Sequence, residues 1–277
     1  MLVFAAIAPH GDIAIEEARD AERPELGRET RAAMTELGRR FGAERPDATI
    51  VLTPHNVHVG GNFAVVTAAE LRGGLGAFLP EDDVAPLTLS CPADPELAGA
   101  VLAALQDADL PAVAASFGGN VPQESVMPMD WGTLVPLWHL GGRSDPPVPA
   151  VVVSPSRDRS LEEHIAAGAA IADAVAATDK RVALVASADH GHAHDADGPY
   201  GFDPAAADYD ARIVELVREN RLGALLELGE LVGEAKADSL WQLLMLHGAL
   251  GDGWRSELLS YEAPTYYGML CAAFQPR

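Results

Sequence analysis

The chain has 277 residues, 48% of them hydrophobic, and its 41 acidic against 19 basic residues give a net charge of −22 at pH 7. This charge disfavours nucleic-acid phosphates and anionic membrane surfaces as partners, and no apolar run reaches the roughly 20 residues that a membrane span needs. The two cysteines, Cys91 and Cys271, lie far apart, and no secretory leader pattern opens the chain, so we expect reduced thiols and a cytoplasmic protein.

Strand-like and helix-like segments alternate along the chain. Leu2–Ala8 is a continuous apolar run, typical of a strand that is covered on both faces, and Thr49–Thr53 is a second one. A helix is expected between them, over 25–41. The later strands are expected at Phe63–Ala68, Leu87–Leu89, Ala112–Ser116, Val151–Val153, Arg181–Ser187, Trp254–Tyr261 and Tyr266–Phe274, and the later helices after Asp94, Ser160 and Asp203 and over Ser239–Leu250.

This alternation predicts an α/β sandwich around a mainly parallel central sheet, with an added hairpin at the C-terminal end. No Pro/Ser/Gly-rich linker and no internal repeat divides the chain. We therefore expect a single domain over residues 1–277.

Histidines follow three of the predicted strands. The first strand runs into Pro9-His10 and the second into Pro54-His55. Three of the nine histidines follow the strand Arg181–Ser187, namely His190, His192 and His194. Since the carboxyl ends of parallel strands line one crevice of an open sheet, these histidines are expected to share a site.

Two histidines with almost no sulfur available predict a metal site that is completed by a carboxylate. Two His and one carboxylate on one face of an octahedron leave positions open for substrate and dioxygen, which suits non-haem Fe(II). Glu262 is the best local candidate, because it interrupts an apolar and aromatic context in which an unpaired charge is costly. An exposed glutamate at a hairpin turn explains the same residue equally well.

The other histidines and several familiar motifs give no competing site. His58 is expected to face away from His55, and His139, His164 and His247 lack a partner at metal spacing, so we interpret them as structural. The sequence contains no Gly-x-Ser-x-Gly elbow, no phosphate-binding loop that ends in Lys-Ser/Thr and no Cys-x-x-Cys pair.

Six motifs follow one another nearly from end to end of the chain. They are Ala8-Pro-His-Gly-Asp12, Thr53-Pro-His-Asn-Val-His58, Met129-Asp-Trp-Gly-Thr-Leu-Val-Pro136, Ser187-Ala-Asp-His-Gly-His192, Gly198-Pro-Tyr-Gly-Phe-Asp203 and Ser260-Tyr-Glu-Ala-Pro-Thr265. In the order and spacing of these motifs the chain resembles the class III extradiol ring-cleavage dioxygenases, catalytic (B-type) subunit, whose wider superfamily includes the Memo-like proteins.

The resemblance implies an Fe(II) cofactor, with Mn(II) or Zn(II) as alternatives, held by His10, His55 and Glu262. It also implies that His192 is the catalytic acid/base, and that Asp189 of the same motif lies at the substrate. Many relatives have a histidine where this chain has Trp131, and we expect Trp131 to line the substrate pocket instead.

The activity implied is insertion of O2 into a catechol-type substrate to give a ring-opened semialdehyde acid, in aromatic compound catabolism. The partners implied are a small aromatic diol and O2, with no nucleic acid or membrane, in a homo-oligomer or with a small or homologous second subunit. Two alternatives stay open, a Memo-like or partner-subunit protein that binds without catalysis, and a Zn(II)-dependent relative.

Overall fold

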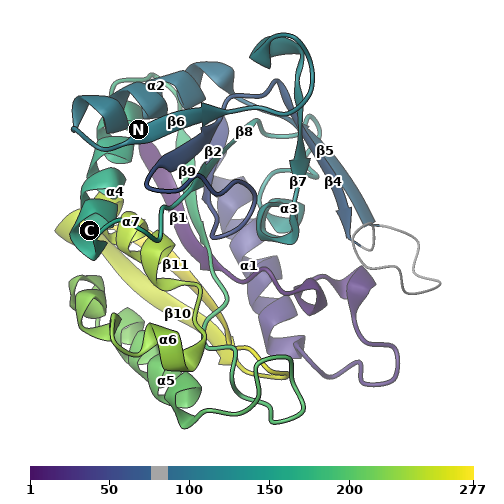
Figure 1. The fold of residues 1–277 in the computed structure, drawn as a ribbon. Helices are drawn as coiled ribbons and strands as arrows, with labels where there is room; N and C mark the ends of the chain where they lie inside the picture. The colour runs from purple at the N-terminus through teal and green to yellow at the C-terminus, as the bar shows by residue number, and fades with distance from the viewer. Residues whose placement is uncertain (76–86) are drawn as a thin grey trace.

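The structure is a computed structural model that describes residues 1–75 and 87–277. Its fold is organised around one eight-stranded sheet (Figure 1). Its strand order is β10-β11-β1-β9-β2-β8-β3-β6. The strands are β1 (Leu2–Ala8), β2 (Ala48–Leu52), β3 (Phe63–Val66), β6 (Ala112–Ala115), β8 (Ala150–Ser154), β9 (Val182–Ser187), β10 (Trp254–Glu262) and β11 (Met269–Pro276).

Four neighbouring pairs of this sheet are parallel, β1 with β9, β9 with β2, β2 with β8, and β3 with β6. The hairpin of β10 and β11 joins antiparallel at one edge, through β11 and β1. The predicted α/β sandwich, with a mainly parallel sheet and an added hairpin, is therefore confirmed.

Helices cover both faces of the sheet. They are α1 (Arg28–Glu44), α2 (Pro95–Asp107), α3 (Trp131–His139), α4 (Leu161–Ala176), α5 (Pro204–Arg218), α6 (Val232–Ala235) and α7 (Leu240–Leu250). One core lies between the sheet and α2, α4, α5 and α7, and the other lies between the sheet and α1 and α3. Alternate residues of β1 enter the two cores, for example Ile7 and Ala6, which explains why this strand is apolar throughout.

The starts of three helices agree with their sequence signals. The side chains of Asp94, Ser160 and Asp203 each accept a hydrogen bond from a backbone N–H of the first helical turn. Ser160 and Glu163 form the reciprocal capping box that the sequence predicts. These caps satisfy backbone donors that have no partner inside the helix.

A second, three-stranded sheet was not predicted. It has the order β5-β4-β7, from β5 (Leu87–Pro92), β4 (Glu70–Leu75) and β7 (Val126–Met129). Two consecutive glycines in β4 and Pro128 in β7 give weak strand signals, because both residue types are disfavoured in strands. The second sheet packs on the same core as α1 and α3.

The sheet brings the predicted histidine-bearing strand ends together. β9 lies directly between β1 and β2 and is parallel to both, so the segments that follow these three strands leave the same edge. Within the described part of the chain, no helix is both long and apolar enough to cross a membrane.

Candidate metal centre

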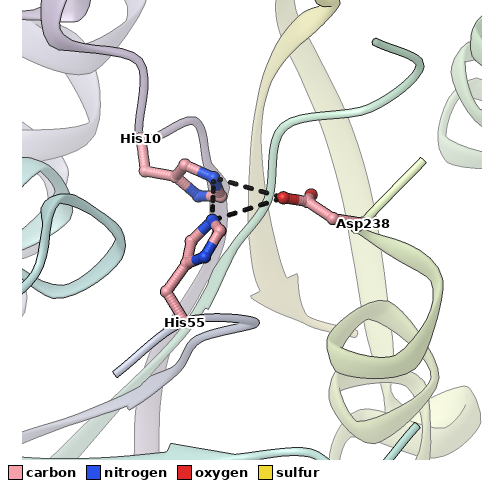
Figure 2. Close-up of side chains that lie close together, drawn as sticks. All are labelled: His10, His55 and Asp238. Carbon is pink, nitrogen blue, oxygen red and sulfur yellow. Dashed lines mark hydrogen bonds and ion pairs between the residues drawn. The ribbon is translucent and has the colours of Figure 1, made fainter. Parts of the chain in front are cut away.

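Three side chains from distant parts of the chain converge at this edge (Figure 2). His10 follows β1, His55 follows β2, and Asp238 lies between α6 and α7. The two Nε2 atoms are 3.2 Å apart, and Asp238 Oδ2 lies 3.7 Å from Nε2 of His10 and 3.3 Å from Nε2 of His55. Ligand atoms held about 2.1 Å from one metal ion lie about 3 Å apart, so these separations suit a shared ion.

Glu262 is not part of this group, which corrects the sequence-based choice of carboxylate. Its Oε1 accepts a hydrogen bond of 2.7 Å from the backbone N–H of Thr30, in the first turn of α1. That helix begins after Gly27, which has no side chain with which to cap it. Glu262 therefore caps α1 from the end of β10, and Asp238 is the carboxylate that faces the two histidines.

Asp238 had no sequence signal that marked it as a ligand. It does not follow a strand, and the segment Ala237-Asp238-Ser239 looks like an ordinary polar start of the helix α7. The only hint is a carboxylate set between the alanine-containing turn α6 and the apolar helix α7, in a stretch where the structure buries Asp238 to 8% exposure.

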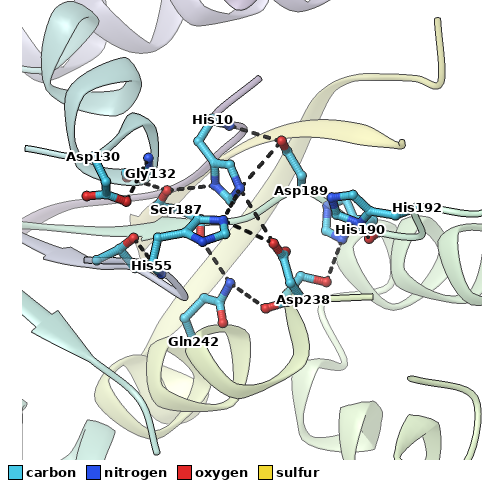
Figure 3. A network of polar contacts seen from close by, with 12 residues as sticks. His10, His55, Asp130, Gly132, Ser187, Asp189, His190, His192, Asp238 and Gln242 are labelled. Atoms are coloured by element: carbon cyan, nitrogen blue, oxygen red, sulfur yellow. Dashed lines mark hydrogen bonds and ion pairs between the residues drawn. The ribbon is translucent and has the colours of Figure 1, made fainter. Parts of the chain in front are cut away.

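His10 is oriented by a hydrogen-bond relay through β9 (Figure 3). The Ser187 hydroxyl donates to the carbonyl of Gly132 at 2.6 Å, and its oxygen lies 2.9 Å from Nδ1 of His10. Because the serine proton is already committed to a carbonyl, Nδ1 of His10 is the donor to Oγ. This fixes the tautomer that leaves Nε2 free to bind a metal, the usual arrangement for a histidine ligand.

Asp189 supports His10 from the other side. Its Oδ1 accepts a hydrogen bond of 3.0 Å from the His10 backbone N–H, and its Oδ2 lies 3.5 Å from His10 Nε2. Burial alone would lower the pKa of His10, but the carboxylates of Asp189 and Asp238 outweigh it and raise that pKa to about 9. The surroundings of His10 thus favour a positive charge at this point.

The same balance keeps Asp238 ionised. Burial alone would raise the pKa of Asp238, but His10 and His55 hold it well below its usual range. The other carboxylate oxygen, Oδ1, is buried and has no hydrogen-bond partner among residues 1–75 and 87–277. Two imidazole nitrogens and an ionised carboxylate with a spare oxygen form a donor set that fits a divalent transition metal.

His55 is held by tight packing against the start of α3. Asp130 caps that helix by accepting a 3.0 Å hydrogen bond from the N–H of Gly132. A Cβ atom at Gly132 would lie 2.5 Å from Oγ1 of Thr53 and 3.0 Å from the His55 ring, so only glycine allows this approach. The ring of Trp131 lies 4.7 Å from the His55 ring, between centroids.

His192 lies at the same edge and lines the same cavity as His10 and His55. Its Nδ1 lies 2.7 Å from the carbonyl of His190, which can only accept, so Nδ1 carries the proton and Nε2 is the basic nitrogen. The ring stacks on Tyr267 with 5.6 Å between centroids and 26° between planes. Its backbone N–H donates to Ala235, which ties it to the segment that carries Asp238.

The loop that carries His192 is anchored by Asp210 of α5, whose side chain is fully buried. Its Oδ1 accepts from the N–H of Gly191 at 2.7 Å. Its Oδ2 accepts from the hydroxyl of Tyr261 at 2.7 Å and lies 2.8 Å from Nε2 of His194. His194 is therefore a structural partner of Asp210, and sequence reasoning had given it no role.

A cavity of about 520 Å³, which we call the main cavity, opens onto these groups. Its lining joins the metal-site residues to aromatic side chains and three carboxylates. The residues are His10, Gly11, Asp12, His55, Gly74, Leu75, Trp131, Asp189, His192, Tyr200, Asp238, Tyr266 and Tyr267. Of the predicted site residues, His10, His55, His192, Trp131 and Asp189 thus meet in one cavity, and Glu262 does not.

The remaining histidines lie outside the main cavity. His164 and His139 each bond a backbone carbonyl, of Ser160 and Ala14 respectively. Burial lowers the pKa of both, which keeps them neutral. His190 is buried beside Ser239, with its Nδ1 3.0 Å from the serine hydroxyl.

Comparisons with known proteins point to one family and one fold. The family model described as the catalytic LigB subunit of aromatic ring-opening dioxygenase matches residues 4–272. Protein CA_C1420 of Clostridium acetobutylicum is 20% identical over 259 residues, which are 92% of this chain and 54% of that protein. The chain therefore spans about half the length of this curated relative.

A solved structure shares the fold. The crystal structure of the uncharacterized protein JW3007 from Escherichia coli K12 is similar over 98% of this chain and 99% of that chain, with a TM-score of 0.63 and 18% identity. At this level of identity the likeness concerns the arrangement of strands and helices alone.

Proposed function

Because the chain belongs to the family of catalytic LigB subunits of aromatic ring-opening dioxygenases, we propose that it is an extradiol dioxygenase. It would open the ring of a catechol-type substrate beside the diol and yield a semialdehyde acid. The observation that carries this proposal is the convergence of His10, His55 and Asp238 on an aromatic-lined cavity that also contains His192.

His10, His55 and Asp238 would hold the metal ion, for which we propose Fe(II). Two imidazoles and one carboxylate are the ligand types of non-haem iron oxygenases, and all three side chains line the main cavity. The chemistry that Fe(II) would supply there is the activation of dioxygen beside the bound diol. Ser187 and Asp189 keep His10 in the binding orientation.

His192 would move the protons of the reaction. Its basic Nε2 can take a proton from a diol hydroxyl and return it as the ring opens, and an imidazole suits both steps because its ordinary pKa is roughly 6.5. The hydrogen bond from Nδ1 to the His190 carbonyl would hold the ring in one orientation throughout.

The aromatic walls would hold the substrate ring and keep water away from it. Trp131 lies against His55, and Tyr267 lies against His192. Tyr266 packs edge-on against Tyr267, with 4.8 Å between ring centroids. A flat aromatic diol in the main cavity can therefore contact these aromatic rings, and such contacts contribute about 0.5–1.5 kcal/mol per pair.

The test is oxygen consumption by protein that is purified without oxygen, loaded with Fe(II) and supplied with a panel of catechols. We expect Fe(II)-dependent oxygen uptake, together with formation of a coloured ring-opened product. His192→Ala should keep the iron and reduce turnover by about two to four powers of ten, which is the usual contribution of a positioned acid/base.

His58→Ala is the matched control, because His58 lies on the same loop as His55 but outside the main cavity. It should retain both iron and turnover. Stoichiometric zinc without iron-dependent oxygen uptake would overturn the proposed reaction, and unchanged turnover in His192→Ala would remove His192 from the mechanism.

A further inference from the structure

The metal-site residues border a second, smaller cavity. It has a volume of about 380 Å³ and shares His55, His192, Tyr200 and Asp238 with the main cavity. Its own wall includes Arg157, Lys236 and Trp241, and we call it the basic side pocket. A molecule bound at the metal ligands would thus border both cavities at once.

The two cavities differ in the charged residues that line them, although Asp238 borders both. Asp12, Asp189 and Asp238 line the main cavity, and no Arg or Lys is among its described lining residues. The segment 76–86, which the structure does not describe, contains no Arg or Lys in its sequence. The basic side pocket contributes Arg157 and Lys236, the latter being one of two lysines in a chain of net charge −22.

Both cations are exposed, and each contacts a neighbouring group without being neutralised. The Arg157 guanidinium lies 4.6 Å from the centre of the Trp241 ring, and the Lys236 ammonium donates to the carbonyl of Gly233 at 2.9 Å. Over the parts of the chain that the structure describes, neither forms an ion pair with a carboxylate. The other lysine, Lys180, shows the contrasting arrangement, because its ammonium lies 2.7 Å from Asp94.

Two unneutralised cations beside an acidic site are suited to an anion that arrives with the ligand. A guanidinium held over an aromatic ring loses little freedom when it binds a carboxylate, and it matches that group with two parallel N–H donors. Lys236 adds a second charge from the segment that also carries Asp238. An uncharged substrate would leave both of these charges unused.

We infer that the substrate is an aromatic diol with a carboxylate on its ring substituent, which Arg157 and Lys236 bind in the basic side pocket while the diol faces His10, His55 and Asp238. This inference rests on the proposed dioxygenase function and adds the substrate class to it. It predicts discrimination among diols that share the same ring and differ in the charge of the substituent.

The experiment compares catechol (uncharged), homoprotocatechuate (carboxylated) and dopamine (cationic) with the Fe(II)-loaded full chain. We expect kcat/KM to be highest for homoprotocatechuate. In the double variant Arg157→Gln, Lys236→Gln, the ratio of kcat/KM for homoprotocatechuate to that for catechol should fall about tenfold to a hundredfold, as expected for the loss of charge-assisted hydrogen bonds.

Two further variants test whether the change in the ratio comes from Arg157 and Lys236 themselves, and not from a change in net charge or from misfolding. Arg218→Gln, Arg255→Gln removes two exposed charges that line neither cavity and should leave the ratio as in the wild type. Lys236→Arg keeps the charge and should keep the preference. A preference for catechol or dopamine in the wild type, or an unchanged ratio in the Arg157→Gln, Lys236→Gln variant, would overturn the inference.

Failure of the proposed function has a different signature, namely no Fe(II)-dependent oxygen uptake with any of the three diols. In that case the inference about the substrate is tested by calorimetry, which measures binding of the same diols to the metal-loaded protein under nitrogen. Tighter binding of homoprotocatechuate, lost in the Arg157→Gln, Lys236→Gln variant, supports the inference, and equal binding of all three diols overturns it.

Discussion

Asp238 and Glu262 are carboxylates of similar reach, and their surroundings separate their roles. Asp238 faces two imidazole nitrogens and keeps one oxygen without a partner in the described structure. Glu262 accepts a hydrogen bond from the backbone N–H of Thr30. A negative charge at this position also suits the positive end of the helix dipole. An apolar and aromatic context marks a carboxylate as unusual, and a helix start elsewhere in the fold can use it as well as a metal can.

Replacing each of these two carboxylates with alanine should affect a different property of the protein, metal binding in one case and stability in the other. Asp238→Ala should abolish stoichiometric metal binding, because it removes one of the three proposed ligands. Glu262→Ala should keep the metal and lower the free energy of unfolding by about 1 kcal/mol, the typical value of a lost helix cap. Metal analysis of both variants measures the metal content, and urea unfolding measures the free energy of unfolding.

Glu262→Gln is the control for the cap, because its amide oxygen can still accept from Thr30, and it should lose less stability than Glu262→Ala. Loss of the metal in Glu262→Ala together with its retention in Asp238→Ala would return the third ligand to Glu262.

At the level of elements, the loop after β9 depends on a helix that sequence reasoning did not connect to it. Asp210 of α5 accepts from Gly191, Tyr261 and His194, and so fixes the backbone on both sides of His192. The backbone of Gly268 packs directly against the Asp210 carboxylate, because a Cβ atom at this glycine would lie 1.9 Å from Asp210 Oδ2. The carbonyl that orients His192 is part of this fixed loop.

Asp210→Asn should therefore affect His192 without changing any metal ligand. The amide has one acceptor fewer and turns N–H groups toward donors, so we expect a loss of about 1–3 kcal/mol in unfolding free energy. We also expect lower kcat with iron content retained, and ¹⁵N NMR of the histidines should show His192 no longer held as the Nδ1–H tautomer.

Tyr261→Phe removes a single donor to Asp210 and should show a smaller loss of stability with the His192 tautomer preserved. Should Asp210→Asn lose stability while kcat and the His192 tautomer stay as in the wild type, Asp210 would be a purely structural anchor and not a positioning residue.

For the whole molecule, the sequence was a good guide to what local patterns determine. Apolar runs such as Leu2–Ala8 and helix caps such as Asp94 depend on neighbours in sequence, and both were predicted correctly. The convergence of His10 and His55 followed from one further rule, that parallel strands end at one edge. The strands β4 and β7 were missed, because tertiary packing overrides their glycines and proline.

The parts of the site that were missed depend on contacts across the fold. Asp238 reaches the histidines only because the start of α7 packs on the sheet, and Glu262 reaches α1 only because β10 ends beside it. Neither distance can be read from spacing along the chain. The same holds for Arg157 and Lys236, which are 79 positions apart in the sequence and line one pocket in the fold.

The two cysteines test the packing of the whole structure. Cys91 and Cys271 are free thiols buried in the core beneath α1 and α3, and burial raises the pKa of each to about 12. The thiols of the unfolded chain have a pKa of roughly 8.5. Their contribution to stability is thus fully present below about pH 8.5 and is lost as the pH rises toward the folded value.

We expect the free energy of unfolding to fall by roughly 1.4 kcal/mol per thiol for each pH unit above about pH 9, measured by urea unfolding up to about pH 9.5, where most tyrosines of the unfolded chain are still protonated. The Cys91→Ala, Cys271→Ala variant should lose this part of the slope while keeping the fold, because alanine leaves only a small cavity. An unchanged slope in that variant would mean that the thiols reach water in the native state. Alkylation of the wild type at pH 8 should agree, with both thiols unreactive until the chain is unfolded.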